Sequence, residues 1–176
     1  MNRHKSLELV TDQLALVEAR LLEPDQQRHG TVDSAVAHLI KSGGKRVRPA
    51  VALLACRMLQ ADCVQAVALA AAVEMLHTAT LVHDDIIDGS LIRRGNPTLN
   101  ANWSPGATIL TGDYLFARAA DLASQTENVT VMHLFAQALM TICNGELHQL
   151  FGSQGARDDR AGYYDRIFAK TGALFV

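Results

Sequence analysis

Apolar residues recur along the chain at the spacing of α-helices. In residues 5–23 they stand three or four positions apart, at Leu7, Val10, Leu14, Val17 and Leu21. This period predicts a helix with one buried face. Comparable runs cover six further stretches, at about 31–43, 49–59, 62–88, 107–123, 128–150 and 161–176. No alternating run of β-branched residues indicates a strand, so the sequence predicts an all-α protein.

Residues that favour helix ends separate these stretches. Asp62 and Ser104 can cap the helices that follow them, because their side-chain oxygens accept hydrogen bonds from free N–H groups. No internal repeat or linker interrupts the pattern, so we interpret residues 1–176 as a single helical domain. The last residues, 170–176, are still apolar and helical in pattern. They indicate either a fragment that ends inside its domain or a domain whose last helix packs inward.

Composition and charge narrow the class of protein. Hydrophobic residues make up 49% of the 176 and charged residues 19%, which is typical of a globular domain. A net charge of −2 gives no electrostatic reason to expect a nucleic-acid partner. No apolar run approaches the roughly 18–20 residues that span a bilayer, and the N-terminus lacks the apolar centre of a signal peptide. We therefore expect a cytoplasmic protein without a transmembrane segment.

Three carboxylates lie within five residues at the end of the longest predicted helix. Asp84 and Asp88 project from one side, one turn apart, and Asp85 lies on the flank. Neighbouring carboxylates repel each other, and burying them without a partner is costly. Mg²⁺ relieves both problems, because it takes oxygen ligands and joins one or two carboxylates to substrate phosphates. A solvated helix end is the alternative, although the residues before it, 76–82, are mostly apolar.

Basic residues accompany this acidic cluster. They form three groups, namely Lys45, Arg46 and Arg48, then Arg93 with Arg94, and finally Lys170 with the hydroxyl of Thr171. The first group lies at a predicted helix start, where free N–H groups favour anions. Arginine binds phosphate oxygens in a fork and lysine acts as a point charge. Each group alone is common on a solvated surface, but together they indicate a polyphosphate held from two sides.

Other polar positions give a weaker signal. His77 shares a helix face with Asp84 and Asp88, so it is either a buried histidine bonded to a backbone carbonyl or part of a polar stripe that lines a cavity. Gln149 lies in an apolar helix and could face the same cavity, and His83 could support Asp84. Other polar residues on apolar helices fit structural roles better, namely His38, Asp113, His133 and Glu146.

The motifs and their order resemble the trans-isoprenyl diphosphate synthases of the long-chain polyprenyl type. The resemblance rests on G-G-K-R-V-R-P at 43–49, E-x-x-H at 74–77, D-D-x-x-D at 84–88, R-R-G at 93–95 and K-T-G at 170–172. The aspartate motif alone is a weak signal, but its combination with the first and fourth motifs at these spacings is highly specific. The resemblance covers essentially the whole chain.

The resemblance implies an isoprenoid-synthase-type helical bundle around a central cavity, usually in a homodimer. Members join an allylic diphosphate to isopentenyl diphosphate, and Mg²⁺ with cationic side chains stabilises the departing diphosphate. By position, Asp84 and Asp88 would bind Mg²⁺, with Asp85 in support. The allylic diphosphate would be held by Arg93, Lys170 and Thr171. Isopentenyl diphosphate would be held by Lys45, Arg48, His77 and Arg94.

Two features bear on the product and on completeness. Ala79 and Thr80 precede Asp84 by five and four residues, where aromatic residues in the family stop the growing chain at farnesyl. Both are small here, so we expect a geranylgeranyl or longer polyprenyl product. The family's second aspartate-rich motif does not follow Asp88. We therefore expect the chain to be the N-terminal part of the domain, truncated at the C-terminus, with little or no activity by itself.

Three alternative interpretations remain. An HD-type metal phosphohydrolase would use His77, His83 and Asp84, but it leaves the motif at 43–49 unexplained. A non-catalytic partner subunit of a prenyl synthase would account for the missing second motif, although the intact residues of the first one argue against it. A terpene cyclase would leave the cations assigned to isopentenyl diphosphate without a ligand.

Overall fold

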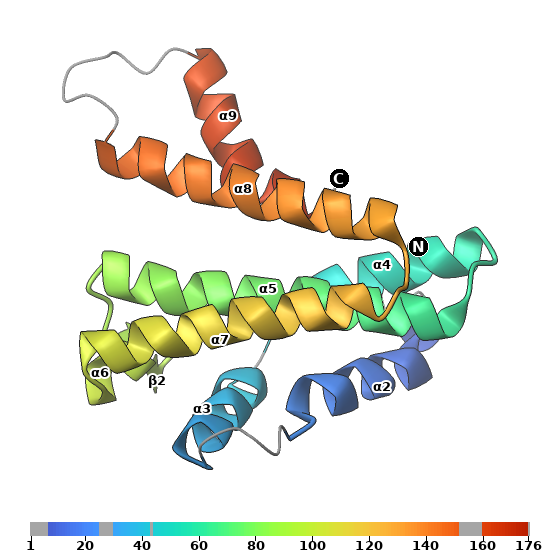
Figure 1. The fold of residues 1–176 in the computed structure, drawn as a ribbon, viewed down its shortest axis with the longest axis horizontal. Coiled ribbons are helices and arrows are strands. Elements are labelled where there is room, and N and C mark those ends of the chain that lie inside the picture. The colour runs from blue at the N-terminus through green and yellow to red at the C-terminus, as the bar shows by residue number, and fades with distance from the viewer. Residues whose placement is uncertain (1–6, 25–29, 43, 152–159, 176) are drawn as a thin grey trace. The chain divides into compact units, whose positions relative to one another are not determined.

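The computed structural model describes residues 7–24, 30–42, 44–151 and 160–175 and is almost entirely helical (Figure 1). Its α-helices are α2 (Thr11–Leu22), α3 (Gly30–Lys41), α4 (Val47–Met58), α5 (Cys63–Ile87), α6 (Leu99–Asn102), α7 (Pro105–Ser124), α8 (Val129–Phe151) and α9 (Arg160–Lys170). The all-α prediction is confirmed. The chain divides into two compact units, Met1–Thr126 and Glu127–Val176, and each is described by itself. The prediction of one domain over 1–176 stays a prediction.

Helix α5 is the central element of the first unit, where it packs against α7, α4 and α2. Its N-terminus is capped as expected, because Asp62 Oδ1 accepts a hydrogen bond of 2.6 Å from the Val64 N–H. Ser104 caps α7 in the same way through the Ala107 N–H. The alanine-rich part of α5 is buried, and Ala70, Ala71 and Ala72 are wholly inaccessible. Small side chains here let neighbouring helices approach closely.

Helix α5 also corrects one expectation about the membrane. By length and composition it is long and apolar enough to cross a bilayer, so the expectation that no apolar run approaches this length is wrong. However, 61% of its most apolar 18-residue window is buried inside the protein. A buried core helix passes the same test, and α5 is such a helix.

A short hairpin lies between α5 and α6, although the sequence pattern indicated no strand. Strands β1 (Ile92–Arg93) and β2 (Asn96–Pro97) pair antiparallel, with Arg93 opposite Asn96. The two turn residues, Arg94 and Gly95, both have positive φ values, of 51° and 81°. A two-residue turn of this kind matches the twist of the strands it joins. The hairpin therefore places the guanidinium groups of Arg93 and Arg94 next to the end of α5.

The second unit consists of α8, α9 and a short 3-10 helix, η1 (Gly172–Leu174). Helix α8 packs closely on α9 at Gly145, where an added Cβ would lie 2.5 Å from the Ala169 Cβ. The predicted helix over 161–176 is wrong at its end, because α9 stops at Lys170 and η1 follows. Glycine weakens an α-helix at Gly172, and the chain tightens there into a 3-10 turn.

Candidate diphosphate-binding site

The first unit contains a pocket of about 490 Å³ that is rich in cationic side chains. Its walls are the end of α3 with the following loop, one face of α5, and the β1–β2 hairpin. Its charged lining residues are Lys45, Arg46, Arg48, Arg93 and Arg94, with the carboxylates of Glu74 and Asp85. Five cations against two carboxylates make the pocket suited to an anion of more than one negative charge.

The pocket brings together the four residues that the sequence assigned to isopentenyl diphosphate. Lys45 comes from the loop before α4, Arg48 from the first turn of α4, His77 from α5 and Arg94 from the hairpin turn. They are far apart in the sequence, so only the fold makes them neighbours. Gly43, which begins the first basic motif, lies outside the described residues.

Arg46, which lies between Lys45 and Arg48, has a different role. Its Nε lies 3.3 Å from Glu18 Oε1, and its Nη1 lies 3.0 Å from Glu74 Oε1. Its Nη2 donates a hydrogen bond of 2.6 Å to the Ile40 carbonyl. One guanidinium thus joins α2, α5 and α3. The sequence showed three cations in a row of four but gave no signal that the middle one is bound to the protein itself.

His77 is a neutral histidine among these cations. Burial and the nearby guanidinium groups of Arg48, Arg94 and Arg93 lower its pKa to about 4. Burial also lowers the pKa of Arg48, which Glu74 raises and Arg94 lowers in turn. At neutral pH, His77 therefore offers one N–H donor and one acceptor nitrogen without adding charge.

Asp85 is the aspartate of the 84–88 motif that lines this pocket. Its side chain is only 7% exposed, and its Oδ1 accepts a hydrogen bond of 2.8 Å from Arg93 Nε. The sequence predicted that His77, Asp84 and Asp88 share one face of α5. His77 lines the pocket together with Leu81, but Asp84 and Asp88 do not line it. The pocket-facing side of α5 is thus rotated away from the stripe, towards Asp85.

Asp84 and Asp88 lie one helical turn apart, as predicted. The Asp88 N–H donates a hydrogen bond of 2.8 Å to the Asp84 carbonyl, and Asp88 is the C-cap residue of α5. Carboxylates at a helix C-terminus oppose the helix dipole, and the last turn of α5 has no basic residue to offset them. A hard cation at this end would relieve that repulsion, and oxygen ligands are what Mg²⁺ prefers. The residues present therefore fit Mg²⁺, although no cluster of three or more metal-binding side chains forms among the described residues.

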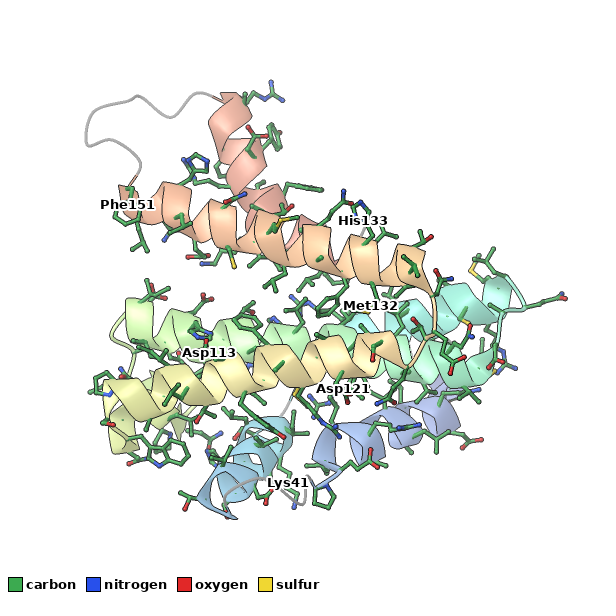
Figure 2. All side chains as sticks on the ribbon, viewed as in Figure 1. Lys41, Asp113, Asp121, Met132, His133 and Phe151 are labelled. Atoms are coloured by element: carbon green, nitrogen blue, oxygen red, sulfur yellow. The ribbon has the colours of Figure 1, made fainter. Side chains whose placement is uncertain are left out.

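His83 contacts Asp113 and Phe116 of α7, and the sequence placed neither of them in the site. Its Nδ1 lies 3.1 Å from the Ala79 carbonyl, and its Nε2 lies 3.2 Å from Oδ1 of Asp113, which Figure 2 labels on α7. The ring stacks on Phe116, with centroids 5.0 Å apart. Gly112 makes room for it, because an added Cβ would lie 2.3 Å from His83 Cε1. The only sequence feature that could have indicated this contact is the glycine next to an aspartate at 112–113.

Lys170, Thr171 and Gln149 meet at a second pocket, of about 230 Å³, between α8 and α9. Lys170 Nζ donates a hydrogen bond of 3.1 Å to Glu146 Oε1, and Lys170 is half exposed. Glu146, which fitted a structural role from the sequence, is therefore the partner of a predicted substrate ligand. This pocket belongs wholly to the second unit.

Ala79 and Thr80 differ in their surroundings. Ala79 is completely buried, whereas Thr80 is half-buried and donates a hydrogen bond of 2.7 Å to the His77 carbonyl. Neither of them lines the 490 Å³ pocket.

Comparison with known proteins identifies the family. The family model described as polyprenyl synthetase matches residues 29–176. This chain belongs to the polyprenyl synthetase family. It is 38% identical over 167 residues to heptaprenyl diphosphate synthase component 2 of Geobacillus stearothermophilus, covering 95% of this chain and 52% of the relative. It is 34% identical over 175 residues to octaprenyl diphosphate synthase of Escherichia coli, covering 99% of this chain and 54% of the relative.

Solved structures agree with this assignment. A decaprenyl diphosphate synthase from Rhodobacter capsulatus matches with a TM-score of 0.90 and 38% identity, over 99% of this chain and 54% of the other. A polyprenyl synthase from Caulobacter crescentus, solved with calcium and isoprenyl diphosphate, matches with a TM-score of 0.87 and 37% identity, over 98% of this chain and 52% of the other. The predicted isoprenoid-synthase-type fold is confirmed. The chain spans about half the length of the relatives it matches.

Proposed function

We propose that this chain belongs to a trans-prenyltransferase that joins isopentenyl diphosphate to an allylic diphosphate and forms a polyprenyl diphosphate. The observation that supports this most is the cationic pocket of the first unit, where Lys45, Arg48, His77 and Arg94 converge. The names of the relatives point to the same reaction, because they are heptaprenyl and octaprenyl diphosphate synthases.

In this proposal the pocket holds the diphosphate of isopentenyl diphosphate. Lys45, Arg48 and Arg94 neutralise its charge, and neutral His77 donates a hydrogen bond to a phosphate oxygen. The reaction begins when the C–O bond of the allylic diphosphate breaks and the diphosphate leaves with the bonding electrons. The double bond of isopentenyl diphosphate then attacks the allylic cation, and the new carbocation loses a proton to form the product double bond.

The departing diphosphate needs positive charge on its oxygens. Arg93 would supply it, and the family resemblance assigns the same role to Lys170, which lines one pocket with Thr171 and Gln149. Asp84 and Asp88 would hold Mg²⁺, with Asp85 supporting through Arg93. When bound, Mg²⁺ supplies further charge stabilisation to the leaving group.

Further properties are part of the same proposal. The small side chains of Ala79 and Thr80 favour a product of geranylgeranyl length or longer. A homodimer is expected from the family resemblance, and the cytoplasmic location expected from the sequence is part of the proposal. The 176-residue chain should show little activity by itself, because a second aspartate-rich motif is missing from it.

Two alternatives are less consistent with the geometry. A phosphohydrolase would need His77, His83 and Asp84 to act on one metal, whereas the His83 ring faces the Ala79 carbonyl and Asp113. A non-catalytic partner subunit has no use for a pocket that retains Lys45, Arg48 and Arg94.

Ligand binding to the chain itself tests the proposal. Isothermal titration calorimetry should detect isopentenyl diphosphate and inorganic pyrophosphate, and Lys45→Ala or Arg94→Ala should weaken both by about tenfold or more. Lys41→Ala is the matched control, since this exposed lysine of α3 lies outside the pocket. Absence of binding to the unaltered chain, or an equal loss in the Lys41 variant, would contradict the proposal.

Activity is tested by incorporation of radiolabelled isopentenyl diphosphate into polyprenyl products. The chain alone should incorporate little label. A version extended by the C-terminal half of the Escherichia coli octaprenyl relative should gain activity that depends on Asp84 and Asp88. Turnover by the chain alone at the rate of a full-length relative would overturn the expectation of an inactive fragment.

A further inference from the structure

Arg46 binds the protein with every donor-bearing nitrogen of its side chain. Its Nε, Nη1 and Nη2 face Glu18, Glu74 and the Ile40 carbonyl respectively. Three of the five N–H donors of this guanidinium are thus directed at the protein rather than at a ligand. The residue also takes the left-handed backbone conformation, with φ of 47°, which is uncommon for residues other than glycine.

The ion pair between Arg46 and Glu74 is largely removed from water. The two side chains are 14% and 7% exposed, and both residues line the cationic pocket. The surroundings of Gly44 show that side chains are closely packed around this ion pair. A Cβ at that position would lie 3.3 Å from Arg46 Nη1, 3.5 Å from Glu74 Oε1 and 3.7 Å from Arg94 Nη1. The carboxylate of Glu74 is therefore close to a cation assigned to the substrate.

A buried carboxylate at this place would oppose the binding of a diphosphate unless its charge were offset. Two like charges repel each other strongly when water is excluded. Removal of one partner from a buried ion pair leaves the charge of the other uncompensated. Glu74 nevertheless faces the pocket, where it also raises the pKa of Arg48. Arg46 supplies the compensating charge from the protein side.

We propose that Arg46 is a positioning residue whose charge neutralises Glu74, so that this carboxylate does not oppose a diphosphate bound by Lys45, Arg48 and Arg94. This inference rests on the proposed function of the pocket. It separates the three cations of the motif at 43–49 into two that bind the ligand and one that does not. It also assigns Glu74 a role, as the residue that fixes the guanidinium of Arg46 at the pocket wall.

A double-mutant cycle with pyrophosphate as the probe tests the inference. Arg46→Gln should weaken pyrophosphate binding by about tenfold or more, because it leaves the Glu74 carboxylate uncompensated. The second change, Glu74→Gln, should restore affinity to within about threefold of the unaltered chain. A residue that contacts the ligand directly would not be rescued in this way, so Lys45→Ala combined with Glu74→Gln serves as the unrescued control.

Each result has a distinct meaning. If the unaltered chain does not bind pyrophosphate, the proposed function fails. If it binds and Arg46→Gln binds equally well, or if Glu74→Gln does not restore the loss in a folded protein, only the role of Arg46 is overturned. Should Arg46→Gln not fold by circular dichroism, the neutral pair Arg46→Gln/Glu74→Gln decides alone. Near-normal affinity of that pair supports the inference, and a loss as large as that of Lys45→Ala overturns it.

Discussion

Arg93 donates a hydrogen bond of 2.8 Å from its Nε to Oδ1 of Asp85, and this bond joins the hairpin to the end of α5. Asp85 is buried by the contact, whereas Asp88, three residues on, is exposed. The carboxylates of one aspartate-rich motif thus lie in different environments. Asp85 pairs with an internal cation, whereas Asp88 is the C-cap residue of α5.

Substitution of these two aspartates should therefore have different effects on stability. Asp85→Asn removes the charge that faces Arg93 and should lower the free energy of unfolding by about 1–3 kcal/mol. Asp88→Asn removes a negative charge from a helix C-terminus and should leave the melting temperature unchanged or slightly higher. Urea and thermal unfolding followed by circular dichroism measure both effects. Equal destabilisation by the two variants would show that the environments do not differ as described.

Gly112 lies close to the His83 ring, so a methyl group added there should destabilise the protein more than one added at Gly106. Gly112→Ala would place a Cβ 2.3 Å from His83 Cε1 and should cost about 1–3 kcal/mol through overpacking. Gly106→Ala is the control on the same helix, because nothing lies within 4 Å of its added Cβ. It should be neutral or slightly stabilising, since alanine favours helix. Urea unfolding decides, and an unaffected Gly112 variant would mean that the ring moves aside freely.

The lowered pKa of His77 predicts a loss of stability at mildly acidic pH. The folded pKa is about 4, below the ordinary value of 6.5, so the unfolded chain binds the proton more readily between these limits. The stabilisation is complete above about pH 6.5 and is lost as the pH falls towards 4, by up to about 3 kcal/mol. The groups that face His77 are Arg48, Arg93 and Arg94, together with the carboxylates that line the same pocket.

His77→Gln isolates this contribution, because glutamine keeps a donor and an acceptor but does not titrate. The difference in unfolding free energy between the variant and the unaltered chain should change between pH 6.5 and 4. A parallel pH profile for the two proteins would assign the acid sensitivity to other groups. Pyrophosphate binding near pH 5 should also take up a proton at His77, which calorimetry in buffers of different ionisation enthalpy can detect.

Product length should respond more cleanly at Thr80 than at Ala79. Ala79 is completely buried, so Ala79→Tyr must force a ring into closely packed surroundings and can unfold the protein. Thr80 is half-buried, and Thr80→Phe should shorten the product of the extended, active version. Thr80→Val is the control of equal size. Chromatography of the products measures the change, and unaltered chain length in a folded Thr80→Phe enzyme would place the cavity floor elsewhere.

Local signals in the sequence predicted most helix positions. The cap at Asp62, for example, needs only the backbone N–H of Val64, two residues away. The sequence could not tell Arg46 from Lys45, because the difference depends on Glu74, which is 28 positions further on. It also could not fix the rotation of α5. Helix α5 is apolar on most sides, and a turn of about 100° separates Asp84 from Asp85, so periodicity did not decide which of them faces the pocket.

Helix α5 is continuous from Cys63 to Ile87, so it fixes the distance between His77 and the aspartates at its C-terminal end. His77 lies at the pocket and Asp84 lies seven residues further along the same unbroken helix, which corresponds to a rise of about 10 Å. In the proposed function, helix α5 therefore fixes the distance between the two diphosphate positions. Substitutions within 78–83 can alter the walls while the distance stays fixed. Insertion of one residue there would turn Asp84 by about 100° and misalign the reacting carbons, even with every ligand present.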